Sequence, residues 1–134
     1  MGESLTLTNS EIKKIREGLN ALSGVSNKAG EITRFDFPTD LVWKIAKLES
    51  IFERAEETLT KARKAIAAKN KIIDGEKLTP ENAPRISAFL AENDILLEQT
   101  QELNGILMLN RSELQKAGVN IPSIFTALMP ILTE

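Results

Sequence analysis

Apolar side chains recur every three or four residues along most of the chain, which is the spacing of helices that bury one side. The longest series steps by 4, 3, 4, 3, 4, 3 and 4 residues through Leu41, Ile45, Leu48, Phe52, Ala55, Leu59, Ala62 and Ile66. This heptad pattern predicts a helix that Thr39 caps and that ends near Asn70. At about 1.5 Å per residue, such a helix is ~45 Å long.

A second series steps by 3, 4, 3, 4 and 3 residues through Ile86, Phe89, Asn93, Leu96, Thr100 and Leu103. Asn104-Gly105 ends the corresponding helix, and a polar connector over residues 74–82 separates the two series. Two helices with matched seams and one connector predict a long antiparallel helical hairpin, coiled-coil-like, over residues 39–104. Asn93 and Thr100 lie within the second seam, where polar side chains can fix the register of the two helices.

The N-terminal region, residues 5–24, begins with the strand-like alternation Leu-Thr-Leu-Thr. Thr8 then stands three residues before Glu11, which is the spacing of a capping box and predicts a helix over residues 9–23. Residues 25–37 show no periodicity and are predicted to form a loop. Three apolar residues of this loop are expected to fold back onto the core: Ile32, Phe35 and Phe37.

The C-terminal region, residues 105–134, contains an echo of the N-terminal one. Residues 107–114 resemble residues 5–12, and both predict a short strand followed by a capped helix start. Because an isolated strand is not stable in water, we expect the two strands to pair into a small two-stranded β-ribbon. Gly118 ends the second short helix, and residues 121–129 predict a last apolar helix.

These elements predict a mainly α protein with a single domain over residues 1–134. The domain comprises a strand and short helix (5–24), the helical hairpin (39–104), and a strand with terminal helices (105–134). A length of 134 residues is common for one domain, and 42% hydrophobic with 27% charged residues is usual for a folded globular chain.

The composition narrows the chemistry, since the chain contains no histidine and no cysteine. The missing residues exclude histidine general bases, cysteine nucleophiles, the Ser-His-Asp triad and nearly all zinc sites. No glycine-rich phosphate loop is present either. We therefore expect no catalytic residues, no metal ligands and no cofactor.

The compartment is expected to be the cytosol, and no membrane contact is expected. Residues 1–10 lack the positive start and apolar stretch of a signal peptide, and no apolar run approaches the ~20 residues that span a bilayer. The formal net charge of −2 gives no general attraction to nucleic acid or to anionic lipid.

Acidic residues form one candidate site. Facing carboxylates on two helices can hold Mg²⁺, as in all-helical nucleotide hydrolases. The predicted seam argues against this reading, because the acidic positions lie beside it and favour a solvated face with helix ion pairs. The residues concerned are Glu49, Glu53, Glu56 and Glu57 on the first helix, with Glu98 and Glu102 on the second.

A basic stretch with no acidic residue within it lies at the end of the long helix. It is a candidate for nucleic-acid phosphate, although no aromatic residues are interleaved for base stacking. Cations at this place are also explained by the helix dipole. The stretch consists of Lys61, Arg63, Lys64, Lys69 and Lys71.

The apolar C-terminal helix is the third candidate. One interpretation is that it covers the core beside the ribbon; the other is that it docks a protein partner or a second copy of the chain. The candidate interface residues are Ile121, Ile124, Phe125, Leu128 and Met129. The heptad seam has the same two interpretations, inside one hairpin or shared between subunits.

The order of several short segments resembles a group of uncharacterised small proteins of tailed bacteriophages and prophages. The matching segments are Leu5–Asn9, Asn20–Leu22, Trp43–Ala46, Leu107–Leu114 and Ala127–Glu134, and together they extend over most of the chain. The resemblance implies a phage or prophage origin and no catalytic residues. It transfers no defined function.

The sequence therefore predicts a non-enzymatic protein–protein interaction protein: a phage accessory or assembly factor, or an inhibitor of a host protein. Self-association through the seam or the C-terminal helix is part of this prediction. Two alternatives stay open, namely a nucleic-acid-binding accessory protein that uses Lys61 to Lys71, and a Mg²⁺-dependent nucleotide hydrolase that uses the acidic residues.

Overall fold

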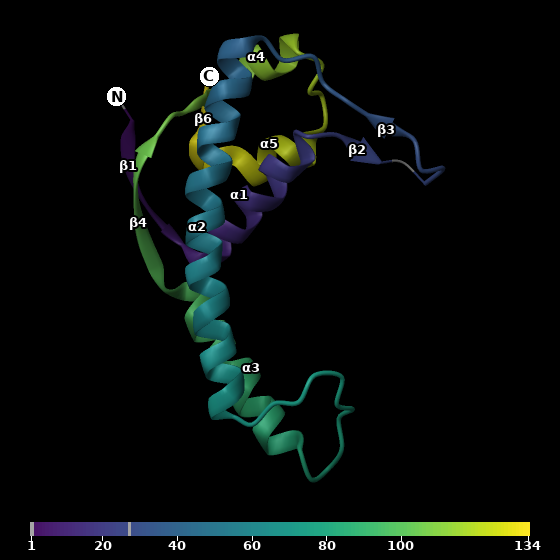
Figure 1. Cartoon of the computed structure of the whole chain (residues 1–134), viewed down its shortest axis with the longest axis vertical. Helices are drawn as coiled ribbons and strands as arrows, with labels where there is room; N and C mark the ends of the chain where they lie inside the picture. Colours follow the sequence, from purple (N-terminus) through teal and green to yellow (C-terminus); the bar gives the residue numbers. More distant parts are fainter. Residues whose placement is uncertain (1, 27) are drawn as a thin grey trace.

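A helix of 31 residues, α2 (Thr39–Lys69), runs through the whole fold (Figure 1). The computed structural model describes residues 2–26 and 28–134. The buried residues of α2 are Leu41, Ile45, Leu48, Phe52, Ala55 and Leu59. They are the first six positions of the predicted seam, so the long helix and its buried side are confirmed. Its N-cap is Pro38 in an extended conformation and not Thr39, and no side chain caps the helix.

The N-terminal helix, α1 (Asn9–Ala21), lies against both α2 and the C-terminal helix α5 (Pro122–Leu128). The predicted capping box is present: the Glu11 amide donates to the Thr8 hydroxyl at 3.1 Å, and the Thr8 amide donates to the Glu11 carboxylate at 2.9 Å. Each contact satisfies a backbone donor that the first turn of a helix leaves free. The cap fixes the point at which the strand becomes the helix.

The two-stranded ribbon exists, but its second strand is not the predicted one. Strand β1 (Glu3–Thr8) pairs antiparallel with β4 (Thr100–Ile106), so that Leu5 lies opposite Leu103. The second long helix, α3 (Ala83–Glu98), therefore ends six residues before Asn104, and its predicted seam is wrong at Thr100 and Leu103. Burial explains why this segment is a strand and not a helix. As part of a strand beside α2, Leu103 and Ile106 are buried in the core.

The C-terminal region has the predicted helix cap, but its strand pairs with a different strand from the predicted one. Strand β5 (Leu109–Asn110) pairs in parallel with β6 (Leu132–Thr133) and not with β1. Asn110 caps α4 (Arg111–Lys116) by accepting the Glu113 amide at 3.1 Å, as the echo of the N-terminus predicted. A short 3-10 turn, η1 (Met129–Ile131), follows α5.

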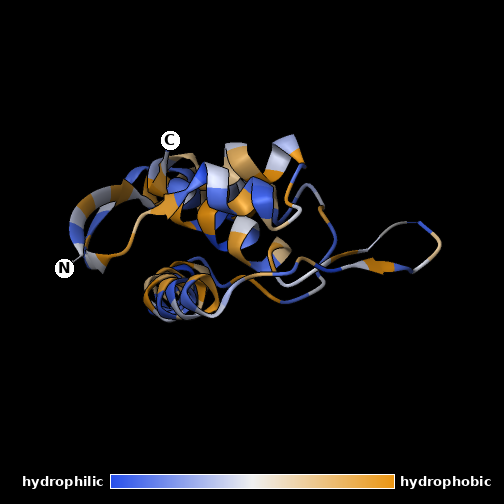
Figure 2. Cartoon of the chain, turned by 90° about the horizontal axis from the view of Figure 1, so that it is seen from above, coloured by the Kyte–Doolittle hydropathy of each residue, from blue (hydrophilic) through white to orange (hydrophobic). Residues whose placement is uncertain are grey.

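The segment predicted as a loop contains a very short hairpin, β2 (Val25–Ser26) with β3 (Ile32–Thr33). It reaches away from the helices, as the view from above shows (Figure 2). Phe35 and Phe37 pack against the core as expected, whereas Ile32 is 57% exposed and does not. Asn27, which belongs to this predicted loop, lies outside the described residues.

The buried core occupies only one part of the molecule. It joins α1, the ribbon, the C-terminal helices and the part of α2 that ends at Ala55; Leu59 is the last buried residue of this helix. Beyond that point α2 continues, and α3 lies beside it after a connector over residues 70–82 (Figure 1). Residues 60–98 are called the arm below. Within the described residues, no helix is long and apolar enough to cross a membrane.

Candidate functional site

A second heptad stripe follows the core seam of α2, displaced from it by one residue. The stripe steps by 4, 3, 4, 3, 4, 3 and 4 residues, and each member lines one of three grooves along the helix. This stripe is called the α2 side face. Its members are Val42, Ala46, Glu49, Glu53, Glu56, Thr60, Arg63 and Ala67.

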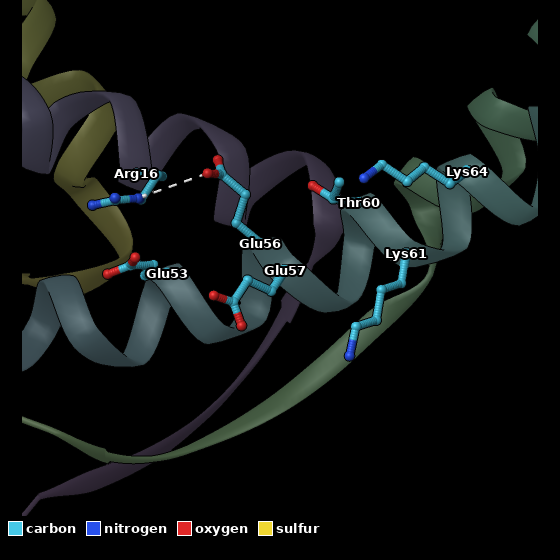
Figure 3. A pocket seen from close by; sticks show the side chains of 7 residues that line it. All are labelled: Arg16, Glu53, Glu56, Glu57, Thr60, Lys61 and Lys64. Carbon is cyan, nitrogen blue, oxygen red and sulfur yellow. Dashed lines mark ion pairs between the residues drawn. The ribbon is translucent and has the colours of Figure 1, made fainter.

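The middle groove of the α2 side face has a volume of about 340 Å³ and is charged (Figure 3). The Arg16 Nε of α1 lies 3.8 Å from a Glu56 carboxylate oxygen, too far for a hydrogen bond, and Nε has no acceptor among the described residues. Carboxylates therefore face one cation of α1 at one end of the groove, and two lysines occupy the other end. The lining residues are Arg16, Glu53, Glu56, Glu57, Thr60, Lys61 and Lys64.

The groove near the start of α2 is mostly apolar, whereas the groove on the arm mixes apolar and charged residues. The groove near the start of α2 has a volume of about 170 Å³, and its apolar lining includes Leu22, Phe37 and Val42. The groove on the arm has a volume of about 310 Å³. Its lining residues are Thr60, Arg63, Lys64, Ala67, Ile72, Asp74 and Phe89. From its start to its end, the α2 side face is thus apolar, then acidic, and then mixed, with basic and apolar residues together.

The six acidic residues singled out in the sequence do not come together. Glu98 ends α3 and Glu102 lies in β4, and both are exposed. In residues 2–26 and 28–134, no group of three or more acidic side chains is placed to hold a metal ion. Glu53, Glu56 and Glu57 meet in one groove, but they share it with three cations.

Three residues of the basic stretch line two neighbouring grooves: Lys61 and Lys64 the middle groove, and Arg63 and Lys64 the groove on the arm. Lys69 pairs with Glu92 of α3 at 3.2 Å, and Lys71 has a backbone φ of 55° in the turn after α2. Lys61 and Lys64 are exposed at the basic end of the middle groove. The acidic side chains nearby reduce the positive potential that nucleic-acid phosphate requires.

The apolar C-terminal helix mostly serves the core. Ile124, Phe125 and Leu128 are buried at 3%, 8% and 0% exposure, because α5 packs on α1. The chain itself therefore covers these three side chains. Ile121 is half-buried, and only Met129 is exposed, at 56%.

The arm is the apolar surface that the sequence interpretation missed. Helix α3 contains no buried residue, and Leu90 and Ile95 are 54% and 59% exposed. In the connector, Ile73 and Leu78 are 66% and 71% exposed. The signal available in the sequence was the presence of Leu90 and Ile95, two apolar residues that lie outside the predicted seam of α3.

Asn9 fixes the root of the arm to the body. Its side-chain amide donates to the Leu96 carbonyl at 2.8 Å, and its side-chain oxygen accepts from Gln101 at 2.8 Å. Gln101 also donates to the Ala55 carbonyl of α2 at 3.2 Å. These bonds join the start of α1, the end of α3, strand β4 and helix α2, so the arm leaves the body at a defined place.

No family model, no curated protein and no solved structure matches the chain. The α2 side face and the apolar arm are therefore the observations from which a function is inferred.

Proposed function

We propose that this chain is a non-enzymatic protein–protein interaction protein of a phage or prophage, which acts in the host cytosol. It serves as an accessory or assembly factor, or it inhibits a host protein. The observation that carries the proposal is α3, a helix with apolar residues on several sides that buries none of them. A helix of this kind is normally covered in the functional state of a protein.

In this proposal α2 and α3 act as an antiparallel, coiled-coil-like hairpin whose apolar side chains a protein partner covers. Ile86, Phe89 and Leu96 are only half-buried in the isolated chain. The Asn93 side-chain oxygen in the same seam is buried and has no donor among the described residues. A buried acceptor without a donor costs free energy. When the Asn93 amide rotates, polar groups of a partner can bind this oxygen and recover that free energy.

The charge distribution supports a protein partner over a nucleic acid. Lys61 and Lys64 lie beside three glutamates in one groove, and Lys69 is paired with Glu92. Alternating charge of this kind suits the polar rim of a protein interface, whereas nucleic-acid sites are strongly basic.

Site-specific photo-crosslinking in bacterial cells tests the proposal. A photoreactive residue replaces Leu90 on the exposed side of α3, and the matched control places it at Ser50, an exposed polar position of α2. We expect discrete protein adducts from position 90 and none from position 50. Equal labelling at both positions, or no adduct at position 90, contradicts a docking role of the arm.

A further inference from the structure

A fourth groove is formed by α4, α5 and the turn between them, in the part of the molecule away from the arm (Figure 1). Its volume is about 410 Å³, larger than any of the three grooves along α2. It is called the Arg111 groove, because Arg111 is the one charged residue among the described residues that line it. The polar lining residues are Gln115, Asn120 and Thr126, and the apolar ones are Pro122, Phe125 and Met129.

Contact with an aromatic ring holds Arg111 in position. Its guanidinium carbon Cζ lies 5.1 Å from the centroid of the Phe125 ring, and Phe125 itself is buried in the core. A cation is attracted to the face of a ring, and this attraction needs none of its N–H donors. Within residues 2–26 and 28–134, Arg111 forms no ion pair and its side chain donates no hydrogen bond. A guanidinium that is held in place with its donors free is suited to bind an anion.

The acidic residue nearest to Arg111 along α4 belongs to another groove. Glu113 lines a groove at the start of α2, together with Asp40 and Lys44. It forms no ion pair with Arg111 in the described part of the chain. The positive charge of Arg111 is therefore available to a carboxylate from another molecule.

We propose that the Arg111 groove binds an extended segment of a protein partner, in which an aspartate or glutamate lies two residues from an apolar side chain. The inference rests on the proposed interaction function and gives the chemistry of a second contact with the partner. Arg111 binds the carboxylate through two parallel hydrogen bonds. Side chains two residues apart point to the same side of an extended chain, so the apolar one contacts Met129, which is 56% exposed. The amides of Gln115 and Asn120 bond to the backbone of the segment.

The shape and the charge of the groove favour a peptide segment over other anions. Gln115, Asn120, Thr126 and Met129 are exposed, so the groove is open to solvent. A small-molecule site buries most of its ligand, whereas an open groove admits a chain that continues at both ends. A single cation is too few for a nucleic acid, whose binding sites neutralise several phosphates.

Titration of the isotope-labelled full chain with two blocked pentapeptides, followed by NMR, tests the groove. The probe is acetyl-Ala-Glu-Ala-Leu-Ala-amide. Its matched control, acetyl-Ala-Gln-Ala-Leu-Ala-amide, has nearly the same shape without the charge. We expect saturable shifts at the amides of Arg111, Gln115 and Thr126 with the probe. The dissociation constant of the control should be roughly tenfold higher, because a neutral hydrogen bond replaces a charge-assisted pair.

Two variants separate Arg111 from the general charge of α4. Arg111→Gln should raise the dissociation constant of the probe roughly tenfold and abolish the difference between the two peptides. Lys116→Gln makes the same change of charge at an exposed position of α4 outside the groove, and it should leave both dissociation constants unchanged. The comparison of the two peptides on the wild-type chain needs no variant, so it stands even if Arg111→Gln disturbs the contact with Phe125.

The proposal is overturned by equal affinity for the two peptides, by shifts outside the groove, or by the same loss of affinity in both variants. Absence of saturable shifts with the probe overturns it as well. If the probe fails while position 90 still forms adducts, the groove is excluded and the interaction function stands. If the probe binds as expected while position 90 forms no adduct, the arm is excluded as a docking site and the Arg111 groove remains.

Discussion

Gly18 marks the closest approach between α1 and α5. A β-carbon built at this residue would lie 2.8 Å from Leu128 Cδ2 and 2.9 Å from Leu128 Cγ, inside the van der Waals distance. Leu128 is fully buried, so a shift of its side chain would disturb the close packing of its neighbours. The sequence pattern gave no indication of this, since a glycine inside a helix is ordinarily only a weak point.

We therefore expect Gly18→Ala to destabilise the protein by about 1–2 kcal/mol, because overpacking outweighs the gain of ~1 kcal/mol that alanine brings to a helix. Urea unfolding followed by circular dichroism measures the change. Asn20→Ala, at an exposed position of the same helix, is the control and should stabilise by a few tenths of a kcal/mol, roughly the propensity difference. A stabilised Gly18→Ala variant would contradict the close packing of α1 on α5.

At the level of elements, local chemistry predicted the helices better than the partners of the strands. Thr8 with Glu11 and Asn110 with Glu113 are cap signals that depend on a few adjacent residues, and both were found. In the sequence, Thr100 and Leu103 continue the heptad series of a helix. In the structure, residues 100–106 form a strand in which Gln101 and Leu103 point to the same, less exposed side. Only the distant partner β1 and the bonds of Gln101 to Asn9 and Ala55 decide between them.

The connector is an element that polar contacts hold together. Arg85 donates to both Glu76 carboxylate oxygens, at 3.3 and 3.1 Å, and to the Lys71 carbonyl at 2.6 Å. The hydrogen bond from Arg85 is the main cause that lowers the pKa of Glu76 below its ordinary value of 4.5, with the Ile73 amide and Asn82 contributing. A carboxyl with a depressed pKa stabilises the fold above its ordinary pKa, and this contribution disappears as the pH falls through the lowered value.

Hydrogen exchange at the Ile73 amide, which contacts Glu76 at 3.3 Å, measures the order of the connector. We expect Glu76→Gln to speed this exchange relative to wild type near neutral pH, because the charged hydrogen bond is lost. The difference should shrink as the pH falls through the lowered pKa of Glu76, below 4.5, where the wild-type carboxyl becomes protonated. Glu81→Gln, at an exposed acid of the same connector, should have no effect. A difference that persists unchanged at low pH would exclude the Glu76–Arg85 ion pair as its cause.

At the scale of the whole molecule, the core and the surfaces differ in how far the sequence predicted them. The core seam of α2 followed directly from the heptad series, since burial and periodicity coincide there. The α2 side face is a second series in the same helix, yet the grooves along it depend on the positions of Arg16, Phe37 and Phe89 outside α2. A site that several elements build is visible only after they are assembled.

The core is buried and α3 is not, and this difference predicts that the two parts of the molecule differ in local stability. Local opening costs little free energy where few apolar contacts are broken, and α3 contains no buried residue. We expect amides over residues 83–98 to exchange roughly a hundredfold faster than those of α2 between Leu41 and Leu59, in a dilute sample measured by mass spectrometry. Uniform protection of both helices in dilute solution would show that α3 is already covered in the monomer, and it would remove the reason to assign the arm a partner.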